Sequence, residues 1–193
     1  MTAAGVRAKL LLVDDRKENL VALEAILQGL PVDSVTVTSG EDALKALLTD
    51  DFAAILLDAQ MPGMDGFETA GHIKQRERTR HLPIIFLTAV ERDAHLAFRG
   101  YAAGAVDYIT KPFDPWVLRA KAGVFIELWA KNKQLEEQTK LARRHEAERH
   151  QLTDAVDEAI RLLGDGHDSG GGDDSGGAAK ALEALRRVRA GRG

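Results

Sequence analysis

Residues 53–67 of the chain read AAILLDAQMPGMDGF. The apolar run from Ala53 to Leu57 is typical of a strand buried on both faces, as in a parallel sheet covered by helices. A charged residue does not fit inside such a run, so we expect Asp58 at the carboxyl end of the strand, the edge at which open α/β sheets bind ligands. The Pro-Gly and Asp-Gly pairs that follow indicate a loop before the next helix.

The same alternation of apolar strands and amphipathic helices runs through residues 8–130. Short apolar runs predict five strands, at residues 9–13, 32–37, 53–58, 83–88 and 105–110. Apolar residues at helical spacing predict four helices between them, at residues 16–27, 41–48, 67–77 and 91–103, and a fifth from Pro115 onward. Strands that alternate with helices form βαβ units with right-handed crossovers. The predicted fold class is therefore α/β, with a doubly wound five-stranded parallel sheet.

Acidic, hydroxyl and basic residues stand where four of the predicted strands end. Asp14 and Asp15 follow the first strand, Asp58 the third, Thr88 ends the fourth and Lys111 follows the fifth. Crowded carboxylates repel one another unless a cation joins them, and hard oxygen ligands suit Mg²⁺. We expect a Mg²⁺ site, with Asp15 as a direct ligand and Asp14 as a second ligand or one that acts through water.

A carboxylate beside a metal ion and a lysine is able to act as a nucleophile toward phosphorus. Asp58 is the candidate nucleophile, while Lys111 would supply a point charge and Thr88 a hydroxyl to the phosphoryl group. Each residue also has a structural interpretation, the acidic pair as a turn and helix cap, Thr88 as a strand former and Lys111 as a solvated lysine. Because these complementary groups stand at the ends of four strands of one sheet, we favour a shared phosphoryl-transfer site over four separate structural roles.

Four motifs stand in order along residues 8–130: VDD at 13–15, LDAQMPGMDG at 57–66, LTA at 87–89 and GAVDYITKPF at 104–113. In these motifs the chain resembles the receiver domain of two-component response regulators. The resemblance implies a flavodoxin-like sheet with the strand order 2-1-3-4-5. It also implies that Asp58 is phosphorylated and that the donor is a histidine kinase or a phosphotransfer protein.

The resemblance assigns roles to the remaining site residues. It implies a metal shell made of four groups: the carboxylates of Asp14, Asp15 and Asp58 and the backbone carbonyl of Gln60. It implies a cis peptide bond between Lys111 and Pro112, and a switch formed by Thr88 and Tyr108, read out on the surface of the fourth helix, fifth strand and fifth helix. From the residues alone, Tyr108 is equally well interpreted as a half-buried strand aromatic.

Enzymes of similar fold are disfavoured by the same stretches. A haloacid-dehalogenase-like phosphatase needs a second acid two residues after its nucleophile, where this chain has Gln60. The glycine-rich turn of a P-loop is missing, and a flavodoxin would use hydroxyl-rich and aromatic loops. The expected function is a phosphoacceptor signalling protein that assists only its own phosphotransfer and dephosphorylation. The alternatives are an unphosphorylated pseudo-receiver adaptor and a receiver fragment of a larger hybrid kinase or regulator.

Beyond the predicted receiver domain of residues 8–130, the sequence changes character. Residues 131–163 continue the helical spacing but are mostly polar between 138 and 151, so a dimeric coiled coil and a plain solvated helix both stay open. Residues 164–177, GDGHDSGGGDDSGG, predict a flexible linker. Residues 178–193 are a short basic segment, interpreted either as an amphipathic helix that docks on a partner or on the protein itself, or as a disordered tail.

The composition of the chain restricts where the protein is expected to be located and which partners it is expected to bind. The chain of 193 residues has 45% hydrophobic content, no cysteine and a formal net charge of -4. It shows no signal peptide, no apolar run near the roughly 18 residues of a membrane span, and no helix-turn-helix. We expect a cytoplasmic protein without direct contacts to nucleic acid or membrane. A homodimer through the face from the fourth to the fifth helix and the C-terminal helix is a further hypothesis.

Overall fold

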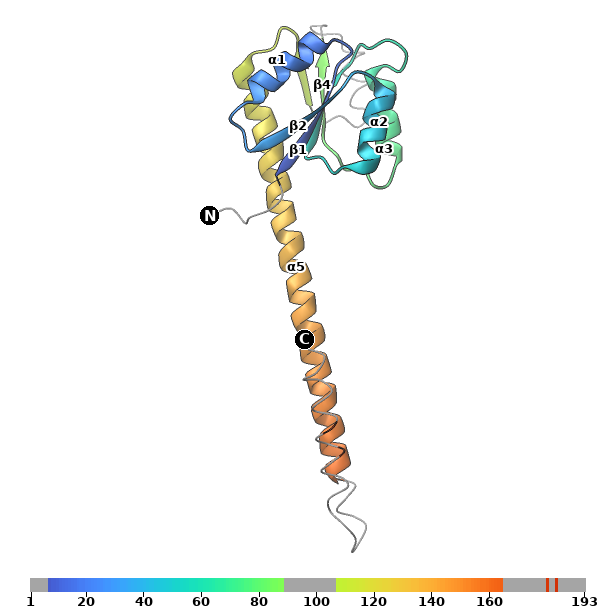
Figure 1. Ribbon diagram of the computed structural model, residues 1–193, viewed down its shortest axis with the longest axis vertical. Helices are drawn as coiled ribbons and strands as arrows, with labels where there is room; N and C mark the ends of the chain where they lie inside the picture. Colours follow the sequence, from blue (N-terminus) through green and yellow to red (C-terminus); the bar gives the residue numbers. More distant parts are fainter. Residues whose placement is uncertain (1–6, 89–106, 165–179, 181–182, 184–193) are drawn as a thin grey trace, which may run out of the picture. The chain divides into compact units, whose positions relative to one another are not determined.

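A computed structural model describes residues 7–88, 107–164, 180 and 183. Within these ranges the chain forms one five-stranded parallel sheet with the strand order β2-β1-β3-β4-β5. The strands are β1 (Ala8–Val13), β2 (Val32–Val37), β3 (Ala54–Asp58), β4 (Ile84–Thr88) and β5 (Asp107–Thr110). The helices are α1 (Lys17–Leu27), α2 (Gly40–Thr49), α3 (Gly66–Gln75) and α5 (Pro115–Gly164), as Figure 1 shows.

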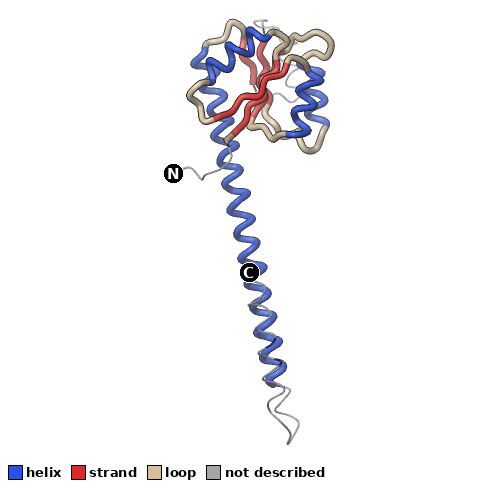
Figure 2. Tube along the Cα trace, viewed as in Figure 1, coloured by secondary structure: helices blue, strands red, loops and turns tan. Residues whose placement is uncertain are grey.

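Two hydrophobic clusters, one on each face, hold the sheet between its helices. On one face Leu10 and Leu12 of β1 pack with residues of α1 and with Leu118 at the start of α5. On the other face Leu11 and Val13 pack with residues of α2 and α3. Successive strand residues point to opposite faces, which is why β1 has to be apolar at both sets of positions. Figure 2 shows the strands enclosed between these helices.

The fold class predicted from the sequence is confirmed, including the strand order and the long C-terminal helix. Boundaries shift by one or two residues, as at α3, which ends at Gln75 and not at Glu77. Asp58 itself closes β3 as its last residue. The predicted fourth helix, residues 91–103, and residues 105–106 of the predicted fifth strand lie outside the described residues.

The helix α5 begins as its sequence predicts. Asp114 stands before Pro115, and its carboxylate accepts a hydrogen bond of 2.7 Å from the backbone N–H of Trp116. From there α5 continues to Gly164. The chain divides into two compact units, Met1–Asn132 and Lys133–Gly193, so α5 contributes to both.

The predicted linker and tail lie outside the described residues, apart from Gly164 at the end of α5 and the helical residues Lys180 and Glu183. Within the described part of the chain, no helix is long and apolar enough to cross a membrane.

Gly66, at the start of α3, is required by a close approach to β3. A Cβ atom added there would lie 2.1 Å from the carbonyl oxygen of Asp58 and 2.9 Å from the Cα of Ala59. The backbone N–H of Gly66 donates a hydrogen bond of 3.1 Å to the carbonyl of Ala59. The chain therefore turns from strand to helix against its own backbone, and only glycine leaves room for this turn.

This close approach predicts opposite effects for two glycines of one helix. Gly66→Ala is expected to lower the free energy of unfolding by about 1–3 kcal/mol or more, because the backbone it strikes cannot move aside cheaply. Gly71→Ala is the matched control, since a Cβ there meets nothing within 4 Å. It should raise the free energy of unfolding by about 0.5–1 kcal/mol. Urea unfolding of the three proteins checks both, and equal stability of the two variants would contradict the packing described.

Candidate acidic site at the sheet edge

The register of the parallel strands brings the predicted site residues to one edge of the sheet. Asp58 pairs with Leu87, so Thr88 lies one residue further along the neighbouring strand. Thr88 in turn pairs with Thr110, the residue before Lys111. The backbone N–H of Lys111 donates a hydrogen bond of 2.6 Å to the carbonyl of Thr88. The ends of β3, β4 and β5 are therefore fixed side by side by the sheet itself.

Asp14 is fully buried and held by several donors. The side-chain amide of Asn19 donates to both of its carboxylate oxygens, at 2.8 and 3.0 Å. The backbone N–H of Arg16 donates to Oδ1 at 3.0 Å. These bonds hold the carboxylate in one orientation, and they compensate part of the cost of burying its charge.

Lys111 joins the two buried acids. Its Nζ lies 2.8 Å from Oδ2 of Asp14 and 3.1 Å from Oδ2 of Asp58. The lysine side chain is 21% exposed, and that of Asp58 is 9% exposed. The peptide bond between Lys111 and Pro112 is cis, as the resemblance implies. One ammonium group therefore stands between two carboxylates at the surface-facing edge of the sheet.

Asp15 completes an acidic cluster with these two residues. One carboxylate oxygen from each of Asp14, Asp15 and Asp58 lies within 4.8 Å of the others. Asp15 is exposed, whereas the other two are buried. Three carboxylates with one lysine leave an excess of negative charge, and an all-oxygen donor set open on one side matches what Mg²⁺ accepts. The chemistry of the donor set therefore fits a hard divalent cation.

The environment of Asp58 disfavours its charged form. Burial raises the pKa of its carboxyl, and the nearby carboxylate of Asp14 raises it further. The Lys111 ammonium and the backbone N–H of Gln60, 3.4 Å from Oδ1, lower the pKa without offsetting the burial. Asp58 thus carries a charge that the folded chain stabilises incompletely, and a bound cation would supply the missing stabilisation.

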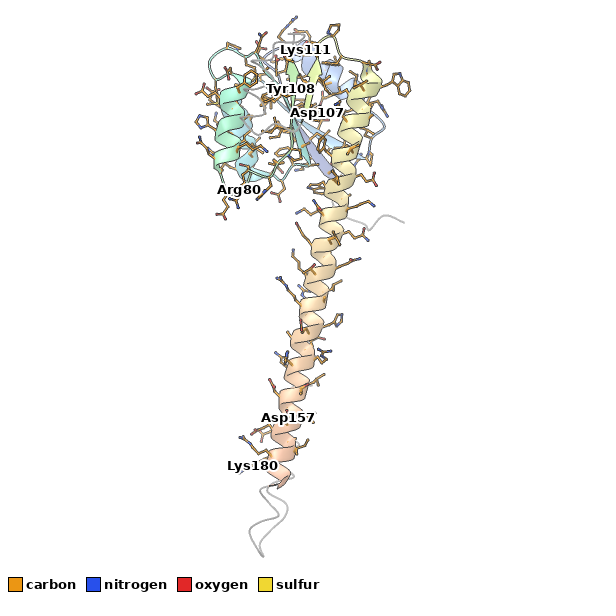
Figure 3. The ribbon with its side chains drawn as sticks, turned by 180° about the vertical axis from the view of Figure 1, so that it is seen from behind. Arg80, Asp107, Tyr108, Lys111, Asp157 and Lys180 are labelled. Atoms are coloured by element: carbon orange, nitrogen blue, oxygen red, sulfur yellow. The ribbon has the colours of Figure 1, made fainter. Side chains whose placement is uncertain are left out.

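Tyr108 lies near the start of β5, on the side away from the acidic cluster. Its ring stacks on Phe86 of β4, with centroids 5.7 Å apart, and Phe86 in turn contacts Phe67 of α3 at 4.7 Å. Figure 3 labels Asp107 and Tyr108 of this strand and Lys111, which follows it. Tyr108 is half-buried, which fits both interpretations of this residue. Thr88 ends β4, the strand that lies between β3 with Asp58 and β5 with Tyr108.

Two residues of the site were not predicted from the sequence. Asn19 binds both oxygens of Asp14, yet a polar residue in the first turn of an amphipathic helix carries no signal of its own. Its position five residues after Asp14 is the only clue. Gly66 belongs to the predicted loop, but its contact with the Asp58 carbonyl depends on how α3 packs against β3.

A doubly wound α/β domain with an acidic cluster and a lysine at the carboxyl edge of its sheet defines the class of the protein. Residues 10–122 match the family model of the response regulator receiver domain. The chain therefore belongs to the response regulator receiver family.

Relatives of known name agree with this assignment. The chain is 38% identical over 114 residues to the response regulator PleD of Caulobacter vibrioides, which covers 59% of this chain and 25% of PleD. It is 38% identical over 113 residues to the sensor histidine kinase GacS of Pseudomonas protegens, covering 55% of this chain and 12% of GacS. The chain thus spans a quarter or less of the length of these two relatives.

Solved structures show the same fold. The chemotaxis response regulator CheY4 of Vibrio cholerae is 30% identical, with a TM-score of 0.58 over 61% of this chain and 97% of that one. The response regulator DrrB of Thermotoga maritima is 33% identical, with a TM-score of 0.56 over 63% of this chain and 54% of that one. In each case the similarity covers the receiver domain.

The raised pKa of Asp58 predicts how stability depends on pH in the metal-free protein. The folded chain keeps a proton on Asp58 at pH values at which the unfolded chain has lost it, so this group lowers the free energy of unfolding as pH rises above about 4. Asp58→Asn removes that loss. The variant's gain in stability over the wild type should therefore grow as pH rises above about 4 and level off once Asp58 has lost its proton in the folded chain, measured by urea unfolding with a chelator present.

Asp42 provides the opposite control. Its hydrogen bond with Lys45 lowers the pKa of its carboxyl, so its contribution to stability is present above its ordinary pKa and is lost as pH falls. Asp42→Asn should lose stability relative to the wild type as pH rises. A constant difference for Asp58→Asn over the pH range would contradict the burial effect.

Proposed function

We propose that the protein is a phosphoacceptor whose Asp58 carboxylate receives a phosphoryl group from a histidine kinase or a phosphotransfer protein. The observation that supports this most directly is the Lys111 ammonium, 2.8 Å from Asp14 and 3.1 Å from Asp58. A cation in this place is able to neutralise a transferred phosphoryl oxygen as the reaction proceeds. Membership of the receiver family supports the same role.

The proposed transfer takes place in one displacement. An Asp58 carboxylate oxygen attacks phosphorus, and the P–N bond of a phosphohistidine donor breaks, with its electron pair going to the imidazole. The phosphoryl oxygens then approach the Lys111 ammonium and the hydroxyl of Thr88. Water later hydrolyses the acyl phosphate and restores the carboxylate. The protein thereby assists its own phosphorylation and dephosphorylation and acts on no other substrate.

Mg²⁺ is the proposed cofactor. Asp14, Asp15 and Asp58 would hold it with the backbone carbonyl of Gln60, and the acidic cluster supports this ligand set. When bound, the ion neutralises the carboxylates and the incoming phosphoryl oxygens. Asn19 keeps the Asp14 carboxylate oriented toward the site, because it donates to both oxygens.

Thr88 and Tyr108 are the proposed switch. Thr88 ends β4 next to Asp58, and the ring of Tyr108 packs on Phe86 of the same strand. A phosphoryl group adds nearly two negative charges and three acceptors, so it selects the conformer in which the Thr88 hydroxyl faces it. The Tyr108 ring would then follow and change the surface of β5 and α5.

We further propose the domain organisation and the partners. Residues 8–130 form the receiver domain, residues 131–163 a helical extension, residues 164–177 a linker and residues 178–193 a tail. The output would pass through protein contacts in the cytoplasm, without direct binding to nucleic acid. The similarity to GacS keeps open a place within a larger hybrid kinase or regulator.

Labelling by a small phosphodonor tests the phosphoacceptor. With acetyl phosphate and Mg²⁺, the wild type should gain one phosphoryl group by intact mass, and Asp58→Ala none. Lys111→Ala should gain it on the order of 100-fold more slowly, because the cation at the phosphoryl oxygens is lost. Asp33→Ala, an exposed acid on β2, is the matched control and should label like the wild type. An unlabelled wild type, as in an unphosphorylated pseudo-receiver, would refute the proposal.

Dimerisation through α5 is tested by light scattering. Leu128 and Leu135 stand seven residues apart on the helix and are 51% and 59% exposed, which is the pattern of a coiled-coil seam. We expect a dimer that weakens on truncation after Ala130 and in Leu128→Asp/Leu135→Asp. Glu127→Asp/Glu136→Asp is the matched control, because it changes the residues next to Leu128 and Leu135 without placing a charge at either leucine position. A monomer at all concentrations, with or without acetyl phosphate, would rule out this dimer.

A further inference from the structure

The last turns of α5 are covered on one side only. Every residue from 134 to 154 is exposed, including Leu141 and Leu135 at 53% and 59%. Near the end of the helix the exposure drops at Ala155 and Glu158, and Ala159 is only 6% exposed. Figure 3 shows side chains projecting from α5 along this length.

The covered positions share one helix face. Ala155, Glu158 and Ala159 are related by steps of three and four residues, which places them next to one another on the helix surface. Ala142 and Ala147, in the same helix, are exposed, so burial does not follow from alanine's small size. The low exposure of Ala159 therefore points to a segment from outside the helix on this face, because the side chains of α5 itself leave Ala142 and Ala147 exposed.

The sequence of the tail fits such a partner. In residues 178–190, AAKALEALRRVRA, the apolar residues Leu182, Leu185 and Val188 recur every three residues and fall on one side of a helix. Lys180 and Glu183 fall on the opposite side, and both are helical and exposed in the structure. A helix of this length is not stable alone in water, so it needs a surface against which to bury its apolar side.

Charge and chain length favour this occupant over others. Next to the covered face α5 carries Asp154 and Glu158, whereas Arg186 and Arg189 lie next to the apolar side of the tail. Residues 165–177 connect the two, and a Gly-rich chain of that length spans about 20 Å. Packed helix axes lie about 8–10 Å apart, so the connection is long enough for the tail to fold back.

We propose that residues 178–190 dock as an amphipathic helix on the α5 face formed by Ala155, Glu158 and Ala159. The apolar side of the tail covers the alanines, and Arg186 and Arg189 face Asp154 and Glu158. This intramolecular contact leaves the part of α5 before Leu152 as the surface open to a second chain.

Hydrogen–deuterium exchange tests the docking on the full chain. In Leu182→Ser/Leu185→Ser the amides of residues 155–163 should exchange at least about tenfold faster than in the wild type, because an uncovered helix end opens more often. Lys180→Ser/Glu183→Ser is the matched control, since it places the same new side chains on the opposite face at unchanged net charge. It should exchange like the wild type.

Two results would overturn the proposal. Equal exchange of residues 155–163 in the leucine variant and the wild type would show that the apolar side of the tail does not cover α5. Protection of residues 155–163 that increases with protein concentration would show that a second copy covers the face. Protection that is independent of concentration and lost only in the leucine variant is the result we expect. The amides of β1 and β3 should be unaffected in every variant.

Discussion

The site depends on one ammonium group placed between two buried carboxylates. Lys111 contacts Asp14 and Asp58, which the chain removes from water at the edge of its sheet. A buried ion pair of this kind gains little stability, because desolvation offsets the Coulomb attraction. The raised pKa of Asp58 shows that the balance is unfavourable for its charge. The arrangement is therefore explained by the chemistry it permits, and not by the stability it contributes.

The sheet supplies the rigidity that this arrangement needs. Each site residue stands at the end of an apolar strand, and the parallel register fixes the ends of β3, β4 and β5 relative to one another. Hydrophobic clusters on both faces hold the strands in place. Because Gly66 lets α3 start against the Asp58 backbone, even the turn beside the site is determined by packing.

The sequence was sufficient for the fold and for the residues at the strand ends. Continuous apolar runs ending in Asp14, Asp58, Thr88 and Lys111 predicted both the parallel sheet and the edge at which the groups meet. The sequence could not show that Asn19 orients Asp14, nor that Gly66 meets the Asp58 carbonyl, because both contacts arise only when separate elements pack. The helical spacing of residues 131–163 also predicted a long last helix, and the structure continues α5 to Gly164. The polar sequence of residues 138–151 left open only whether this helix forms a coiled coil or stays solvated.

The proposed function requires that the phosphoryl group resides on Asp58 and on no other acid of the cluster. Reduction with borohydride converts an aspartyl phosphate to homoserine, and peptide mass spectrometry then identifies the position. After phosphorylation, we predict homoserine at residue 58 alone. Homoserine at Asp14 or Asp15, or an unmodified residue 58 in a protein that carries the phosphoryl group, would contradict the account.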